Sequence, residues 1–291
     1  LTYAGDIAQT AGSLLVATTT QATSSAGSVD LSAATNDFGG LVSAAATAAG
    51  KTVTITDANN VTVAVTAGGA AVVNAVAGNV VASGAASGLT AVGIDVTSAV
   101  STTGDSTLTA SGDASNSGAV GGNLVVTATS AASNTGAVTG NATLTSTSDA
   151  AVSSAATVGG TLSTNGGATT VSGTVGALAT DSSTLSLGTT TVTGAANLTA
   201  TGAISQTGAL TVGGATTINA PGQTVTLANA NNDFVGAVTL TSAGSVTLAD
   251  KNSLTVSGSA ASLTATAVGA VSDTGGTIAG EADPACNGAR Y

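Results

Sequence analysis

The residues of this sequence that could do chemistry are few. A hydrolase needs an acid, a base or an activated nucleophile held close together, and without histidine the usual serine and cysteine triads cannot be assembled. Paired carboxylates can cleave glycosidic bonds. However, the nearest acidic pair along the chain, Glu281 and Asp283, lies in a C-terminal tail that lacks a strand pattern. We therefore predict that the protein is not an enzyme and has no catalytic residues.

Metal and cofactor sites are not predicted either. The only cysteine, Cys286, cannot form an internal disulfide, and we expect it to be an idle thiol rather than a cross-link between chains. Two segments, 57–60 and 250–252, offer side-chain oxygens that could bind a cation. An Asx-type turn is the simpler interpretation of both.

The distribution of charge bears on two further classes of protein, nucleic-acid-binding proteins and membrane proteins. Three basic residues stand against 14 acidic ones, so the net charge of −11 argues against nucleic-acid binding. No charge occurs between Asp57 and Asp95, but several asparagines and glycines interrupt that stretch. We therefore predict no membrane span.

Composition restricts the kind of core. The chain has 291 residues with 40 glycines, 1% aromatic residues and no methionine or tryptophan, so side chains that fill an irregular core are scarce. Disorder is disfavoured because 43% of the residues are hydrophobic and only 6% are charged. These values favour a narrow, repetitive interior.

The hydrophobic pattern has the period of a β-strand. Apolar residues recur at i and i+2, with Gly, Asn, Ser or Asp in the gaps, which predicts short strands separated by tight corners. The clearest pairs are Val225/Leu227, Val238/Leu240, Val246/Leu248 and Leu254/Val256.

A longer repeat overlies the strands. A Val-x-Gly-(Asn/Thr/Ala) unit recurs at similar intervals, for example in the copies that begin at positions 120, 138 and 158. The fold predicted from this spacing is all-β: a parallel β-helix (β-solenoid) with three faces and about 20 residues per coil. Asn-Gly hairpin turns are rare, which disfavours a β-sandwich. We expect one continuous solenoid over 1–279 and a non-repetitive tail or joint segment over 280–291. The copies of the Val-x-Gly-(Asn/Thr/Ala) repeat lie at 76–79, 120–123, 138–141, 158–161, 192–195 and 212–215.

Two cassettes, about 5–64 and 202–257, repeat the same order of motifs. GDIAQTAGSLLV at 5–16 returns as GAISQTGALTV at 202–212, and each copy is followed by NDF and then by TDANNVTV or ADKNSLTV. Together they resemble the repeat region of large bacterial secreted adhesins similar to filamentous haemagglutinin. The resemblance implies a right-handed β-helix, two-partner secretion, an extracellular or outer-surface location, and adhesion.

The cassettes also yield a prediction for their only large side chains. Phe38 and Phe234 are expected to fill equivalent corners, and contact with a ligand is the alternative. The residues expected to cap the adjacent turns are Asn36 and Asp37 in the first copy and Asn232 and Asp233 in the second.

Two functions follow as hypotheses. The first is a non-catalytic stalk or adhesin segment at a bacterial surface, whose partners would be glycans or proteins that the sequence does not identify. The second is a filament subunit that associates end to end, with strands near 14–16 and 268–278 pairing between copies and 280–291 over the joint. An ice-binding threonine ladder and a polysaccharide-active β-helix enzyme are weaker alternatives.

Overall fold

The computed structural model describes residues 1–10 and 12–278, and every regular element in this part of the chain is a β-strand. The described strands pair in parallel with those of the next coil, which confirms the predicted all-β parallel solenoid. The chain divides into two compact units, Leu1–Thr147 and Ser148–Tyr291. A single solenoid over 1–279 stays a prediction. The tail, with Glu281, Asp283 and Cys286, lies outside the described residues.

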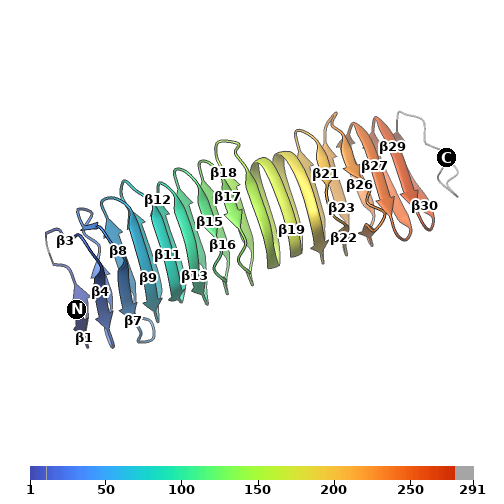
Figure 1. The fold of residues 1–291 in the computed structure, drawn as a ribbon. Helices are drawn as coiled ribbons and strands as arrows, with labels where there is room; N and C mark the ends of the chain where they lie inside the picture. Colours follow the sequence, from blue (N-terminus) through green and yellow to red (C-terminus); the bar gives the residue numbers. More distant parts are fainter. Residues whose placement is uncertain (11, 279–291) are drawn as a thin grey trace. The chain divides into compact units, whose positions relative to one another are not determined.

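Unit 1 has two main faces of stacked strands (Figure 1). Face one consists of β1 (Thr2–Tyr3), β4 (Thr20–Ser24), β7 (Val42–Ala46), β9 (Val61–Ala67), β11 (Val80–Ala86), β13 (Val96–Thr102), β15 (Ala114–Asn116) and β17 (Ala132–Asn134). Face two consists of β2 (Ile7–Ala8), β5 (Val29–Leu31), β8 (Val53–Asp57), β10 (Ala70–Ala75), β12 (Gly88–Gly93), β14 (Ser106–Ala110), β16 (Leu124–Ala128) and β18 (Ala142–Ser146).

The third face of unit 1 is narrower. Its first two coils contribute β3 (Leu15–Val16) and β6 (Asp37–Phe38), which pair with each other. In later coils the single parallel bridges from Thr102 to Val120 and from Val120 to Val138 lie at another corner, between face one and face two. The prediction of three faces per coil is therefore correct for the first two coils.

Unit 2 begins with β19 (Val152–Val192), which is wound around successive coils of this unit (Figure 1). Within this unit, the strands numbered here as face one are β20 (Ala196–Ala200), β23 (Thr216–Ala220), β26 (Val238–Ala243), β28 (Leu254–Ala260) and β30 (Val271–Ile278). Face two contains β21 (Ile204–Gln206), β24 (Val225–Leu227), β27 (Ser245–Asp250) and β29 (Ser262–Ala267). Face three contains β22 (Leu210–Val212) and β25 (Asp233–Phe234).

Coil length varies along the chain around a typical value of about 18 residues. Hydrogen-bonded corner residues of adjacent coils show the range. Asp105 and Asn123 have a sequence separation of 18. The separation is 22 between Leu14 and Asn36 but 16 between Asn79 and Asp95. The predicted coil length of about 20 residues is thus close to the typical value, and the insertions are concentrated in the two cassettes.

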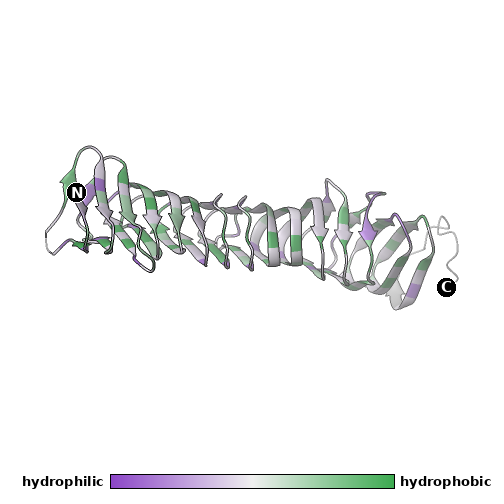
Figure 2. Cartoon of the chain, turned by 90° about the horizontal axis from the view of Figure 1, so that it is seen from below, coloured by the Kyte–Doolittle hydropathy of each residue, from purple (hydrophilic) through white to green (hydrophobic). Residues whose placement is uncertain are grey.

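The interior consists of stacked aliphatic side chains. Strand alternation turns every second residue inward, and parallel register places it over its counterpart one coil below. Leu108, Val126 and Leu144 form one such column and Leu198, Ile218 and Leu240 another, all 1% exposed or less. Each buried Leu or Val contributes about 1.5–3 kcal/mol. Figure 2 shows that strongly hydrophilic residues are sparse along the ribbon.

The apolar pairs predicted from the sequence do lie in this interior. The valines of the Val-x-Gly repeats lie there too, with one exception. The eight residues of the pairs between Val225 and Val256 are all buried. Valines at 120, 138, 158, 192 and 212 are buried as well, but Val76 is exposed. Ala75 occupies the inward position in that coil, where it is paired with the buried Asp57 below, so the next residue points outward.

Candidate functional site

The first cassette is held together by a partly buried pair of side-chain amides, Gln9 and Asn36. Gln9 Nε2 donates to Asn36 Oδ1 at 2.8 Å, and Asn36 Nδ2 donates to Gln9 Oε1 at 2.9 Å. Asn36 is fully buried, and its Oδ1 also accepts the backbone N–H of Leu14 at 2.9 Å. This amide pair closes the longer corners that precede β3 and β6.

The second cassette repeats the same pair with Gln206 and Asn232. The two reciprocal amide bonds are again 2.8 and 2.9 Å long, and Asn232 Oδ1 accepts the N–H of Leu210 at 2.8 Å. The prediction that Asn36 and Asn232 cap local turns therefore describes only part of their role. Their side chains bind a glutamine from the preceding coil, which sequence spacing alone did not reveal.

Asp57 and Asp250 close the next coil in each cassette. Oδ2 of each aspartate accepts a backbone N–H of the preceding coil, from Phe38 or Phe234, at 2.7 Å. Oδ1 accepts the N–H two residues later, from Asn59 at 2.7 Å or from Asn252 at 2.6 Å. The second bond is an Asx turn. The predicted Asx turns are thus confirmed, and both oxygens of each carboxylate have a structural role.

Phe38 and Phe234 occupy equivalent buried positions, as predicted. They are 3% and 2% exposed and are paired with Val16 and Val212, respectively, one coil below. A side chain so enclosed cannot contact a ligand at the surface, so the ligand-contact alternative is wrong. Beside them, Asp37 is exposed, and Asp233 forms an ion pair with Lys251 at 2.9 Å.

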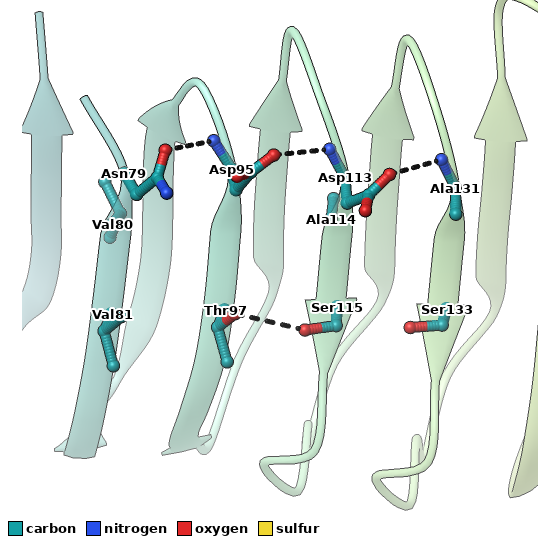
Figure 3. A pocket seen from close by; sticks show the side chains of 10 residues that line it. All are labelled: Asn79, Val80, Val81, Asp95, Thr97, Asp113, Ala114, Ser115, Ala131 and Ser133. Carbon is teal, nitrogen blue, oxygen red and sulfur yellow. Dashed lines mark hydrogen bonds between the residues drawn. The ribbon is translucent and has the colours of Figure 1, made fainter. Parts of the chain in front are cut away.

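Unit 1 carries an open groove of about 440 Å³ along face one, lined by both polar and apolar side chains (Figure 3). One side is the corner row, Asn79, Asp95, Asp113 and Ala131, in which each Oδ1 accepts the backbone N–H of the next member. These bonds measure 3.1, 2.9 and 2.9 Å.

The other side of the groove is the hydroxyl row, Thr97, Ser115 and Ser133, which are stacked in register on β13, β15 and β17. Ser115 Oγ donates to Thr97 Oγ1 at 3.4 Å. Successive members are one coil apart, about 4.8 Å. The groove therefore presents one hydroxyl group per coil beside the carboxylates of Asp95 and Asp113.

The corner row corrects one sequence-based expectation. Glu281 and Asp283 are the closest acids along the chain, and no other acidic cluster is evident in the sequence. The structure places Asp95 and Asp113 on adjacent coils although they are 18 residues apart. Their separation equals one typical coil, and this spacing was the available signal.

A family model shares sequence with both cassettes. The family described as repeats of unknown function (DUF5649) matches residues 1–45 and 172–241. No curated protein and no solved structure matches the chain. These matched repeats contain both amide pairs and both phenylalanines, whereas the groove of unit 1 lies outside them. The repeats shared with the family are thus the segments that the buried amides close.

Residues 1–10 and 12–278 contain no group of three or more His, Cys, Asp or Glu side chains placed to hold a metal ion. Over the same residues, no helix has the length and apolar character required to cross a membrane.

Proposed function

We propose that this chain is a non-catalytic structural solenoid outside a bacterial cell, where it serves as a rigid stalk or adhesin segment. The observation that carries the proposal is that carboxylates join coils. Asp57, Asp95 and Asp113 each accept a backbone N–H of a neighbouring coil. A side chain used in this way stabilises the stack, as expected of a protein whose role depends on its rigidity.

The groove of unit 1 is the surface best suited to adhesion. Its three hydroxyl groups repeat once per coil, a spacing similar to the length of one sugar residue in an extended glycan. Hydrogen bonds from such rows suit a neutral or amino polysaccharide, whereas like charges disfavour a sulfated or carboxylated one. We therefore propose an extended, non-acidic glycan as the ligand class.

A glycan array with the full chain tests this assignment. The variant combines Thr97→Val, Ser115→Ala and Ser133→Ala, which removes the hydroxyl row and leaves the corner row in place. We expect binding to neutral or amino glycans to fall at least tenfold, with little change in stability because the three side chains lie on the outer surface.

A matched control is available on face two of the same unit. Thr109, Thr127 and Thr145 are stacked in register and point outward. Replacing all three with valine should leave glycan binding unchanged. If the wild-type chain binds no glycan, or if both triple variants behave alike, the adhesive role is overturned and only the stalk remains.

A polysaccharide-active enzyme is the alternative raised by Asp95 and Asp113. Glycosidases place their two carboxyl groups on opposite sides of the bond that they cleave. Here both carboxylates belong to one row, and each is bound through Oδ1 to the next coil. Incubation with a polysaccharide panel should therefore release no new reducing ends. Turnover that is lost in Asp95→Asn or Asp113→Asn would overturn the non-catalytic proposal.

A filament subunit is the second candidate function. In this alternative, strands near 14–16 and 268–278 would pair between copies, as the sequence predicts. Strands with one unpaired edge readily accept another strand.

A further inference from the structure

One segment of unit 1, residues 58–94, contains no charged residue. It forms two successive coils, with β9 and β11 on face one and β10 and β12 on face two. In the coils that follow, exposed aspartates return at the corners, for example Asp105 and Asp113. A chain with a net charge of −11 thus has two coils in its interior stretch that carry no charge.

The outer side of face two extends this uncharged surface over six coils. Strand register stacks its outward residues in two rows, one from Thr54 on β8 to Thr143 on β18 and one from Asn74 on β10 to Thr145 on β18. Every member is a threonine, a valine or an asparagine, so neither row carries a charge on these described strands.

Exposed aliphatic side chains gather on this face. Val72, Val92 and Val125 belong to the two rows and are 37%, 39% and 38% exposed. Val76 and Ile94, which follow the ends of β10 and β12, are 56% and 45% exposed. A single exposed valine is common, but several on neighbouring coils form the kind of patch that marks a protein interface.

Charge and spacing select the partner. A basic partner would be attracted to the aspartates at the corners, so face two suits a surface that is itself uncharged. A second copy of this chain has such a surface, with the same coil spacing of about 4.8 Å. Side chains of one copy can therefore fit between those of the other, as they do between the two sheets of a β-sandwich.

The available area is sufficient for a weak dimer. Six coils of five-residue strands measure about 29 by 17 Å, or about 500 Å² for each copy. Two copies would bury about 1,000 Å² in total, which is near the lower limit for a specific interface. Asp30, which is paired with Thr54, ends the uncharged row one coil earlier. The contact should therefore be reversible.

We propose that face two of unit 1 packs against face two of a second copy, so that two solenoids associate side by side. Because both copies use the same surface, the assembly is complete with two copies. The contact uses the side of the coils, whereas a filament would use their ends. It leaves the groove on face one exposed and does not depend on glycan binding there.

Salt should strengthen this dimer. Each copy has a net charge of −11, and the exposed Asp105 lies at the corner directly before β14, at the margin of face two. Salt screens the repulsion between such charges, and sulfate in addition strengthens the burial of apolar surface. Sodium sulfate should therefore favour the dimer more than sodium chloride at equal ionic strength.

Two matched variants separate this contact from a general effect of charge. Val92→Glu places an unpaired carboxylate within the patch on face two. Val81→Glu is the control, because Val81 lies on face one of the same unit and is 45% exposed, against 39% for Val92. Both variants add the same charge to an exposed valine of a strand. Circular dichroism and thermal unfolding confirm that each variant is folded.

Sedimentation equilibrium of the full chain provides the first test. Wild type and Val81→Glu should approach twice the mass of a single copy as protein and sulfate concentrations rise, and Val92→Glu should raise the dissociation constant by about tenfold or more. Wild type that stays a single copy under all conditions overturns the proposal. Equal weakening by the two variants also overturns it, as does association that continues beyond two copies.

Cross-linking provides a second test that does not require a weakened variant. Thr107→Cys, near the middle of the six coils, and Ser101→Cys, on the outer side of face one, are each combined with Cys286→Ser. A short bismaleimide should join two copies of the Thr107→Cys chain but not two copies of the Ser101→Cys chain. Equal yields of cross-linked pairs from the two chains would overturn the assignment of face two.

Discussion

Gln206 and Asn232, 26 residues apart in the chain, exchange two side-chain hydrogen bonds of 2.8 and 2.9 Å in the interior of unit 2. Asn232 is fully buried, and its remaining contacts are with backbone groups, the N–H of Leu210 and the carbonyl of Leu227. The pair thereby satisfies polar groups that the long corners would otherwise leave buried without partners.

Replacing Asn232 with leucine should destabilise the second cassette locally. The change leaves Gln206 and the Leu210 N–H without their partner, so we expect the free energy of unfolding to fall by about 2–4 kcal/mol. Hydrogen exchange of the β22 amides measures this loss. Asn231→Leu, at an exposed neighbour, should change it by less than about 0.5 kcal/mol. Equal effects of the two substitutions would contradict the role of the pair.

Asp57→Asn tests the aspartate that joins two coils. Both carboxylate oxygens accept backbone N–H groups, from Phe38 and Asn59, each at 2.7 Å. The amide NH₂ of asparagine would face one of these donors, and we expect a loss of about 1.5–3 kcal/mol in the free energy of unfolding. Urea denaturation followed by circular dichroism measures the loss. Asp37→Asn, on the exposed side, should be nearly neutral, and a larger effect there would refute the assignment.

Gly136→Ala tests how closely consecutive coils approach at the corners. An added Cβ would collide with the carbonyl oxygen of Gly118 one coil below and lie 2.9 Å from Asn116 Nδ2. Because a backbone carbonyl cannot move aside, unit 1 should lose about 2–3 kcal/mol of stability. At Gly88 the same Cβ would meet only Asp105 O, at 3.1 Å, so Gly88→Ala should cost less than about 1 kcal/mol. Thermal unfolding of the two variants compares them.

Ice binding by the outward threonines is not expected. A flat threonine ladder matches a lattice only when outward threonines continue in register over many coils. Here the row formed by Thr109, Thr127 and Thr145 is interrupted by Val92, which is paired with Thr109. Purified protein should therefore show no thermal hysteresis above that of an equal concentration of serum albumin. Measurable hysteresis that is lost on replacing the outward threonines of face two (Thr109, Thr127 and Thr145) with valine would reverse this expectation.

Much of the fold could be predicted from the sequence. The alternation at Val225/Leu227 and Val246/Leu248 identified strands with one buried side, and the spaced glycines identified corners. The repeated cassettes placed Phe38 and Phe234 at equivalent positions. All of these are local or periodic properties, which an aliphatic sequence with strand period displays directly.

The partners of the polar side chains were decided only by the tertiary structure. Asn36 binds Gln9, and Asp95 binds the N–H of Asp113, because coil stacking brings those residues together. Coil length changes from place to place, so the residue that lies above another cannot be obtained from one fixed period. Strand alternation was thus determined by the sequence itself, whereas register between coils was decided by the sum of the corner insertions and by the buried polar groups that hold them.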